Sequence, residues 1–478
     1  MLNIGNKRME RDELTMEQQQ QVSPVALKIA YIGGGSRGWA RILMNDLARC
    51  PHLSGEVWLY DIDMESACLN EQLGNWMQNQ PGVVSKWHYV AEPTLEKALK
   101  GADFVILSIQ PGSLEVMGEL LAIAAKYGMF FPVGDTTGAP GLVRGLFSAI
   151  TYAGFAHAIA EHCPKAWVIN YTNPMTICTR TLTKVAPQLK VFGCCHEVFS
   201  TQQMLARLVV TYLGVTTPPS RDEIEVNVTG INHFTWVDRA TYKGHDLLAL
   251  LRHHIVQPGV RREYSREEVE ATGNYFHNAD QIKFELFQRY GILAAAGDRH
   301  LAEFMPGFTR SPEELGRWGV ILTPISYRLA RWEEAPQRTR DLMEGRLSFF
   351  LRETGEEGVR QISAILGLGD IRTNVNLENI GQIPNLPLRA VIETNAYFSR
   401  DSVRPLAAGP LPAGVHALVA RHVSNQEMIV EAALAGDKDL AFQAVFNDPT
   451  TNLPIDDAWQ MFNEMLVASK AYLPGWNI

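Results

Sequence analysis

The stretch Lys28-Ile29-Ala30-Tyr31-Ile32-Gly33-Gly34-Gly35-Ser36-Arg37-Gly38 decides the fold of this 478-residue chain. An apolar run that predicts a strand leads directly into glycines with the spacing G-x-G-x-x-G. Such glycines allow a tight turn and let the backbone approach a pyrophosphate at the N-terminus of the following helix. The stretch therefore predicts a dinucleotide-binding loop. The loop residues expected to contact the cofactor are Gly33, Gly35, Ser36, Arg37 and Gly38.

Two further segments fit the same edge of a sheet. Val57-Trp58-Leu59-Tyr60 predicts a second strand and ends at Asp61, an acid placed to accept hydrogen bonds from the adenosine ribose and to favour NAD over NADP. A helix-capping role is the alternative for Asp61. Gln110 follows another apolar run, at the carboxyl edge where such cofactors lie. Together these segments predict NAD binding.

The first two hundred residues alternate apolar runs with amphipathic stretches. This alternation favours an α/β fold, a Rossmann-type doubly wound parallel sheet with helices on both faces. The expected strands are 28–32, 56–60, 87–91, 103–109, 167–170 and 190–193. The expected helices are 40–50, 64–80, 114–127 and 144–162.

The pattern changes near residue 200, where a second, mostly helical α+β lobe begins. Two antiparallel strands are expected at 226–231 and 234–242, and helices at 279–290, 337–351 and 425–434. Pro336 fits the start of the second of these helices. We expect a flexible extension over residues 1–26, an NAD-binding domain over 27–200 and a substrate and metal domain over 201–478.

Composition excludes several classes of protein. The net charge of −9 and the absence of a basic run argue against nucleic-acid binding, and no apolar stretch reaches the length of a membrane span. The first 24 residues are polar and lack the apolar core of a secretion signal. Six cysteines are too few for a disulfide scaffold in a chain of this size, and reduced thiols predict the cytoplasm. We expect a small-molecule substrate and a homodimer or homotetramer.

Polar side chains also follow the last two strands of the predicted sheet. Asn173, before Pro174, would place its amide over the site to hold a substrate hydroxyl, or would belong to a simple turn. Cys195 and His196 follow the next strand, and His233 lies further along the chain. Thiolates and imidazoles bind divalent transition metals well, but a Cys at the end of an apolar strand is also commonly a core residue. From the residues alone, a metal site and a structural role both stay open.

Four ordered motifs resemble those of glycoside hydrolase family 4. They are Gly-Gly-Gly-Ser-Arg-Gly-Trp-Ala from residue 33, Thr-Asn-Pro-Met-Thr from 172, Gly-Cys-Cys-His-Glu-Val-Phe from 193 and Gly-Ile-Asn-His-Phe-Thr-Trp from 230. The resemblance runs from about residue 27 to at least 310 and is strongest to the α-galacturonidase branch. It implies a fold related to lactate and malate dehydrogenases, and the use of NAD⁺ with a divalent cation, usually Mn²⁺.

The resemblance also implies roles for individual residues. Cys195 and His233 correspond to metal ligands, and Asn173 to the Asn that contacts the sugar. His196 stands where the family has its general acid or a group that assists the leaving oxygen. The Tyr-rich motif that supplies the base in many members is missing here, and Gly297-Asp298-Arg299-His300 occupies its region. We expect Asp298 to be the base, ahead of the two less favoured candidates Tyr275 and Tyr290.

The mechanism implied by the resemblance is an exception to the two-carboxylate scheme of glycosidases. It oxidises the sugar and reduces it again, so that no net oxidation remains. Hydride leaves C3 of an α-galacturonide, the C2 proton is removed, the glycosidic oxygen is expelled, water adds, and the hydride returns. Arg299 and Arg144 are candidates to bind the uronic carboxylate, although structural ion pairs are an alternative for both.

Other functions stay open from the sequence. They are a dehydrogenase of the lactate and malate type acting on a 2-hydroxy acid, another α-glycosidase of the same family, and a non-catalytic NAD-binding regulator.

Overall fold

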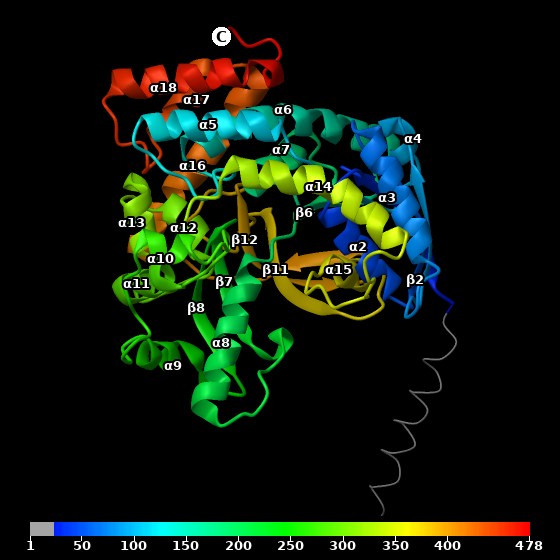
Figure 1. The fold of residues 1–478 in the computed structure, drawn as a ribbon, viewed down its shortest axis with the longest axis horizontal. Helices are drawn as coiled ribbons and strands as arrows, with labels where there is room; N and C mark the ends of the chain where they lie inside the picture. The colour runs from blue at the N-terminus through cyan, green and yellow to red at the C-terminus, as the bar shows by residue number, and fades with distance from the viewer. Residues whose placement is uncertain (1–22) are drawn as a thin grey trace, which may run out of the picture.

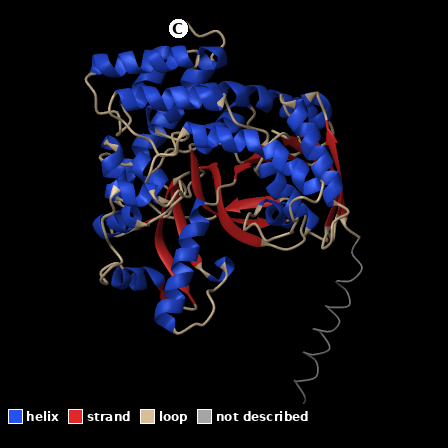
Figure 2. Cartoon of the chain, viewed as in Figure 1, coloured by secondary structure: helices blue, strands red, loops and turns tan. Residues whose placement is uncertain are grey.

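A nine-stranded sheet forms the centre of the computed structural model, which describes residues 23–478 (Figures 1 and 2). Its strand order is β13-β12-β11-β6-β5-β4-β1-β2-β3. Strands β1 to β6 pair parallel to one another, whereas β11, β12 and β13 pair antiparallel. The strands are β1 (Val25–Ile32), β2 (Leu53–Tyr60), β3 (Lys86–Ala91), β4 (Phe104–Leu107), β5 (Trp167–Asn170), β6 (Lys190–Gly193), β11 (Ile371–Glu378), β12 (Val391–Ser399) and β13 (Ser402–Pro405).

Both faces of this sheet are buried, because successive side chains of a strand point to opposite sides. Ile29 and Tyr31 of β1 belong to one apolar cluster, and Ala30 and Ile32 to another. The first face is covered by α2 (Trp39–Ala48), α3 (Met64–Met77) and α15 (Gly358–Ile365). The second is covered by α4 (Leu95–Leu99), α6 (Gly138–His162) and α7 (Met175–Val185).

A smaller antiparallel sheet organises the second lobe. Its strands are β7 (Glu225–Ile231), β8 (Phe234–Tyr242), β9 (His245–Asp246) and β10 (Leu293–Ala294). Two apolar clusters contain residues of this sheet. One includes α8 (Glu197–Leu213) and α9 (Leu247–His254), and the other includes α12 (Asp298–Phe304) and α16 (Ala413–Ala435). Helix α11 (Gln281–Tyr290) contributes residues to both clusters.

The remaining helices surround this framework (Figure 1). The last two, α17 (Lys438–Phe446) and α18 (Ile455–Ala468), pack with α5 (Leu114–Lys126), α6 and α16 in one cluster. Other helices are α10 (Arg266–Glu270), α13 (Pro312–Arg317), α14 (Ile325–Met343) and the short 3₁₀ turns η1 (Arg221–Glu223), η2 (Phe308–Arg310) and η3 (Lys470–Tyr472).

The predicted fold class is confirmed, and the sheet also crosses the expected domain boundary. Strands β11 to β13 come from the second half of the chain, yet they extend the first sheet. The expected extension ends earlier than predicted, because Val25 and Ala26 already belong to β1. The rest of that prediction, residues 1–22, lies outside the described residues.

The prediction that a helix starts at Pro336 is wrong. Helix α14 begins at Ile325 and contains this proline. Proline lacks an N–H, so the carbonyl oxygen of Trp332, four residues earlier, has no helical donor. The Arg37 guanidinium supplies that donor, and it also lies 4.0 Å from the centre of the Trp332 ring. A tertiary contact with the glycine loop thus stabilises a helix that the proline would otherwise weaken.

One described helix, α6, is long and apolar enough to cross a membrane, but 61% of its apolar window is buried inside the protein. It packs against α5, α7 and α16, which is the environment of a core helix.

Gly33 is the loop position that tolerates a side chain least. Its φ is +96°, and a Cβ there would lie 2.0 Å from the carbonyl oxygen of Ser108. We predict that Gly33→Ala lowers the free energy of unfolding by about 2–3 kcal/mol, because the backbone conformation and the contact both oppose a methyl group. Urea denaturation measures the effect. Gly38→Ala, with nothing within 4 Å, is the matched control and should change stability by less than about 0.5 kcal/mol. Equal destabilisation of the two variants would contradict the prediction.

Candidate active site

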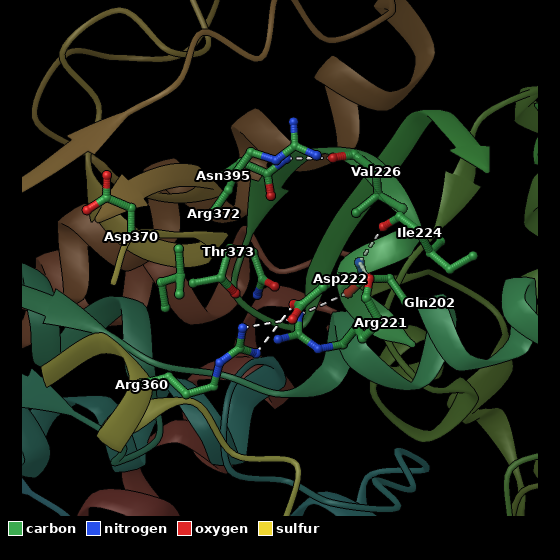
Figure 3. Close-up of a pocket in the computed structure, with 12 residues that line it drawn as sticks. Gln202, Arg221, Asp222, Ile224, Val226, Arg360, Asp370, Arg372, Thr373 and Asn395 are labelled. Carbon is green, nitrogen blue, oxygen red and sulfur yellow. Dashed lines mark hydrogen bonds and ion pairs between the residues drawn. The ribbon is translucent and has the colours of Figure 1, made fainter. Parts of the chain in front are cut away.

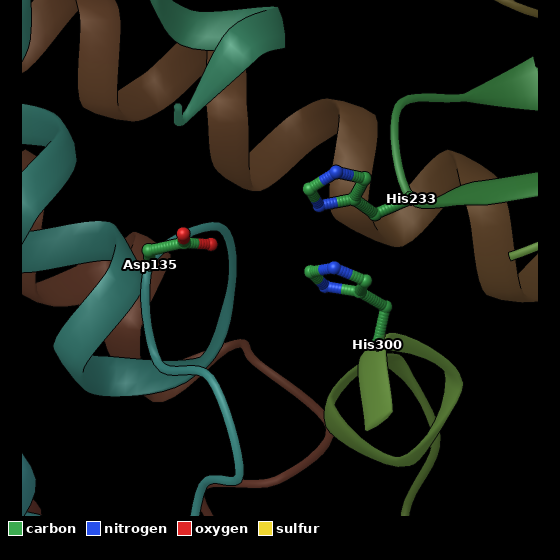
Figure 4. Close-up of side chains that lie close together, drawn as sticks. All are labelled: Asp135, His233 and His300. Atoms are coloured by element: carbon green, nitrogen blue, oxygen red, sulfur yellow. The ribbon is translucent and has the colours of Figure 1, made fainter. Parts of the chain in front are cut away.

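Asp135, His233 and His300 bring three potential ligand atoms within 4.8 Å of one another (Figure 4). Asp135 lies in the loop between α5 and α6, His233 in the turn between β7 and β8, and His300 in the first turn of α12. The two imidazole rings stack with their centres 3.7 Å apart. Three segments that are distant in the chain therefore meet at one point.

The segments are held by their own hydrogen bonds. The carboxylate of Glu303, one turn after His300, accepts from the backbone N–H groups of Val133 (2.6 Å) and Gly134 (2.9 Å) and so fixes the loop that carries Asp135. His233 has a φ of +62°, a backbone conformation that suits the tight turn joining β7 to β8.

The chemistry of these donors fits a divalent transition metal. Burial lowers the pKa of His233 to about 3 and also lowers that of His300, so both imidazoles are neutral at pH 7 and offer lone pairs. Nδ1 of His300 is buried, and no described residue forms a hydrogen bond with it. Two imidazole nitrogens and a carboxylate oxygen suit Mn²⁺, Fe²⁺ or Zn²⁺. The site would accept a resident cation through these three side chains.

Cys195, the other predicted ligand, does not belong to this group of three. It is buried at the end of β6, and its carbonyl oxygen accepts from the amide of Asn374 (3.2 Å). Burial raises the pKa of its thiol, and the nearby carboxylates of Glu393 and Glu197 raise it further. The thiol would therefore have to lose its proton when a metal binds. Its ligand role stays a prediction.

Glu393 connects Cys195 to the His233 turn. Its carboxylate accepts from the amide of Asn374 (2.7 Å) and from that of Asn232 (3.2 Å), the neighbour of His233. One buried carboxyl group thus links the two predicted ligands indirectly, through the side-chain amides of Asn374 and Asn232.

His196 lies at the N-cap of α8, with 47% of its side chain exposed. Its ring stacks on Trp39, at the start of the helix that follows the glycine loop, with the ring centres 5.5 Å apart. Nδ1 lies 2.9 Å from Oε1 of Glu356. Burial lowers the pKa of His196, but the hydrogen bond and charge of Glu356 outweigh it and raise the pKa above its ordinary value. A proton on this ring is therefore stabilised, as a general acid requires.

Asp298 is fully buried, and its carboxylate faces α11. Oδ1 accepts from the backbone N–H of Lys283 (2.9 Å), while Oδ2 has no hydrogen-bond partner among the described residues. Burial raises the pKa of Asp298 to about 7, and the charge of Asp280 contributes. Its role as the base stays a prediction. Of the less favoured candidates, Tyr275 packs on Tyr327 and Tyr290 on Trp236.

The glycine loop and Asp61 form one hydrogen-bonded unit. The N–H of Gly35 donates to Oδ2 of Asp61 (2.8 Å), and the N–H of Asp63 donates to Oδ1 (2.9 Å). Helix α3 is capped by Asp63, which leaves Asp61 without a capping function. The N–H of Ser36 donates to the carbonyl of Gly33 (2.8 Å), which closes the turn.

Asn173 follows β5 at the same edge of the sheet. The oxygen of its side-chain amide is buried and has no hydrogen-bond partner within residues 23–478. This free acceptor agrees with the predicted contact to a substrate hydroxyl, which stays a prediction.

Three guanidinium groups lie near the triad formed by Asp135, His233 and His300. They belong to Arg144, Arg299 and Arg328, and none of them forms an ion pair among the described residues. Arg299 donates to the carbonyl of Pro132 (3.0 Å) and to the hydroxyl of Thr323 (2.7 Å). Arg144 donates to the amide oxygen of Gln110 (2.9 and 3.2 Å) in the amide orientation that satisfies both groups. Burial lowers the pKa of Arg144 and of Arg299, and the charge of Arg328 on α14 lowers both further. Arg328 is therefore close enough to repel both of the other guanidinium groups, while the carboxylate of Asp135 partly offsets their charge.

Reasoning from sequence missed Asp135, His300 and Arg328. His300 stands inside a motif that the sequence had marked, two residues after Asp298. Asp135 lies in Gly-Asp-Thr-Thr-Gly, a loop signal without a chemical signature of its own. Arg328 is one of four arginines in the amphipathic helix α14, and the sequence does not single it out. Only the tertiary fold shows that these residues meet.

A separate cavity of about 260 Å³ lies between η1, α15 and β11 (Figure 3). Its arginines are neutralised by nearby acids: Arg360 pairs with Asp222 (2.8 Å) and Arg372 with Glu225 (3.4 Å). Asn374 in its lining also donates to the carbonyl of Cys195. The cavity therefore adjoins the segment between β6 and α8 that carries Cys195, and its arginines are paired with acids.

Comparison with known proteins identifies relatives along nearly the whole chain. The family 4 glycosyl hydrolase model matches residues 28–211, and the model of the C-terminal domain of that family matches residues 228–451. The chain is 50% identical to the alpha-galacturonidase of Thermoanaerobacterium saccharolyticum over 459 residues, which cover 95% of this chain and 97% of the relative. It is 48% identical to the alpha-galacturonidase of Bacillus subtilis, with 92% of this chain and 97% of the relative covered.

Solved structures show the same fold. The crystal structure of lplD from Bacillus subtilis is 47% identical, with a TM-score of 0.85 and coverage of 92% of this chain and 100% of the other. A 6-phospho-alpha-glucosidase from gut microorganisms, solved in complex with NAD and Mn²⁺, is 19% identical, with a TM-score of 0.77 and coverage of 95% and 100%.

We predict that Cys195→Ser and His300→Gln each weaken Mn²⁺ binding by more than about 10-fold. His300→Gln removes an imidazole donor, and Cys195→Ser removes the thiol predicted to be a ligand. NAD binding should be nearly unchanged, since the glycine loop is built from other segments. Isothermal titration with Mn²⁺ and with NAD⁺ measures both affinities. His254→Gln, a partly buried histidine that bonds Tyr212, is the control. Unchanged Mn²⁺ affinity in Cys195→Ser would exclude the ligand role of that residue.

Proposed function

Because this chain belongs to family 4 of the glycosyl hydrolases, we propose that it is an α-galacturonidase that uses NAD⁺ and a divalent cation, with Mn²⁺ as the first candidate. The substrate would be an α-galacturonide, such as a fragment of pectin. Relatives named alpha-galacturonidase, at 47–50% identity over more than nine-tenths of this chain, support the choice of sugar.

The observation that carries the proposal is the group Arg144, Arg299 and Arg328. Buried or partly buried cations are costly unless an anion compensates them. No described carboxylate forms an ion pair with any of these three groups, although Asp135 and Glu303 lie nearby. The carboxylate at C6 of a uronic acid would supply the missing charge. A neutral hexoside would not.

The chain's own residues take distinct tasks in this proposal. Asp135, His233 and His300, with Cys195 beside them, would hold the cation, which polarises the oxidised sugar and makes its C2 proton acidic. NAD⁺ bound by the glycine loop would accept and return the hydride. Asn173 would orient a sugar hydroxyl through its free amide oxygen. His196, whose protonated form is favoured by the nearby carboxylate of Glu356, would protonate the leaving oxygen.

Asp298 remains the proposed proton acceptor. Its raised pKa of about 7 suits a base that works near neutral pH, but its Oδ1 is engaged with α11. The free Oδ2 is the atom that would act.

The test is an incubation with NAD⁺, Mn²⁺, a reductant and an aryl α-galacturonide in D₂O. We expect release of the aglycone, deuterium at C2 of the product and no accumulation of NADH, because the hydride returns to the sugar. Mass spectrometry or NMR of the sugar and absorbance at the NADH band give the readouts. Stoichiometric NADH without cleavage would instead identify a dehydrogenase.

A second prediction concerns the arginines. We expect Arg328→Gln to lower kcat/KM for the α-galacturonide by at least about 10-fold, roughly 1.4 kcal/mol, because the carboxylate loses a charged partner. Activity on the matching α-galactoside should not fall. Arg331→Gln is the control, since Arg331 lies on the same helix, is exposed and bonds Tyr327. An equal fall in kcat/KM for both sugars would show that Arg328 does not act through the uronic carboxylate.

The proposal extends to a cytoplasmic homo-oligomer. All six cysteines lie in the described residues and none of them is in a disulfide, which suits a reducing compartment. Light scattering coupled to size-exclusion chromatography would distinguish a dimer or tetramer from a monomer.

A further inference from the structure

The hydroxyl of Thr136 lies between two members of the triad. Its side chain is fully buried, and Oγ1 is 2.7 Å from Oδ1 of Asp135 and 2.9 Å from Nδ1 of His233. The residue therefore joins the carboxylate to the imidazole through one oxygen atom.

The number of protons on that oxygen decides the state of the histidine. A threonine hydroxyl has one proton and two lone pairs. A carboxylate only accepts, so the Thr136 proton goes to Asp135. Towards His233 the same oxygen must then accept, which requires a proton on Nδ1. The neutral ring carries one proton, and Nε2 is left with its lone pair.

The surrounding backbone leaves Thr136 little freedom. A Cβ at Gly141 in α6 would lie 2.7 Å from the carbonyl carbon of Thr136, so that the helix packs directly on this peptide. The next residue, Thr137, bonds His422 (3.2 Å) and Asp448 (3.2 Å) in the core. The hydroxyl is thus held in place from both sides.

The ring of His233 is restrained as well. Its backbone is in the left-handed region, and its neighbour Asn232 is tied to Glu393. The imidazole ring of His233 also stacks on that of His300. With both ends of the contact fixed, the Thr136 hydroxyl sets the tautomer rather than adapting to it.

We propose that Thr136 is a positioning residue that fixes His233 as the Nδ1–H tautomer and so presents Nε2 to the divalent cation. Thr136 does not touch the cation or the substrate in this role. The inference rests on the proposed use of a metal at the triad, but not on which sugar is the substrate.

Two substitutions separate the hydroxyl from the shape of the side chain. Thr136→Val keeps the shape and removes the hydroxyl, whereas Thr136→Ser keeps the hydroxyl. In the metal-free, full-length protein without substrate, we expect Thr136→Val to raise the Kd for Mn²⁺ by about 10- to 100-fold, the usual effect of removing a partner of a metal-binding histidine. Thr136→Ser should stay within about three-fold of the native protein. Electron paramagnetic resonance of free Mn²⁺ gives the Kd.

Thr235→Val is the matched control. Like Thr136, Thr235 is a buried threonine close to the site, two residues after His233 in β8, but its hydroxyl has no hydrogen-bond partner in the described part of the chain. Its substitution should leave the Kd unchanged. A native-like Kd in Thr136→Val, or an equally large rise in Thr136→Ser, would overturn the proposal.

A measurement on the native protein keeps the proposal testable if Thr136→Val does not fold. In protein labelled with ¹⁵N-histidine, the resonances that His233→Gln removes should show a protonated Nδ1 and an unprotonated Nε2 before metal is added. A protonated Nε2 would overturn the proposal. Both measurements omit substrate, so an absence of galacturonidase activity would contradict the proposed function and leave this inference intact.

Discussion

The structure depends on one constraint: a carboxylate and two imidazoles must stay within 4.8 Å of one another although they come from three distant segments. Each of these residues stands at the end of an element rather than inside it. Asp135 precedes α6, His233 lies in a hairpin turn, and His300 is in the first turn of α12. Residues at element ends can point into a shared space while the elements themselves pack in the core. The two sheets and their helices act as supports for that meeting point.

Much of the fold could be predicted from the sequence. All six strands expected in the first half appear in the parallel part of the larger sheet, because their apolar runs are short and separated by amphipathic stretches. Strands β11 and β12 escaped prediction because several of their polar residues are buried through pairing, as Asn374 is with Glu393. The helix around Pro336 was misplaced for a related reason. Its stability depends on a donor from Arg37, nearly three hundred residues earlier.

The site was predictable only in part. His233 was found from its motif, and the structure places it in the triad. Its partners Asp135 and His300 carry no spacing signal, since they meet through tertiary packing. The placement of Asp298 shows the same limit. The sequence suggests an acid in the region where the family has its base, but it does not show the direction in which the carboxylate points. Burial of that carboxylate against the backbone of α11 is a property of the fold.

Helix α14 joins the cofactor end of the molecule to the substrate end. Trp332 contacts Arg37 of the glycine loop, and Arg328 lies one turn earlier, on the same helical face. Its charge acts on Arg144 and Arg299 beside the triad. A divalent cation bound at the triad would add to the positive charge already gathered there. On the proposed function, the uronic carboxylate would offset part of this positive charge, so the metal and the anion of the substrate would each favour the binding of the other. A chain with a net charge of −9 thus gathers three arginines that form no ion pair among the described residues near the site where an anionic sugar is expected to bind.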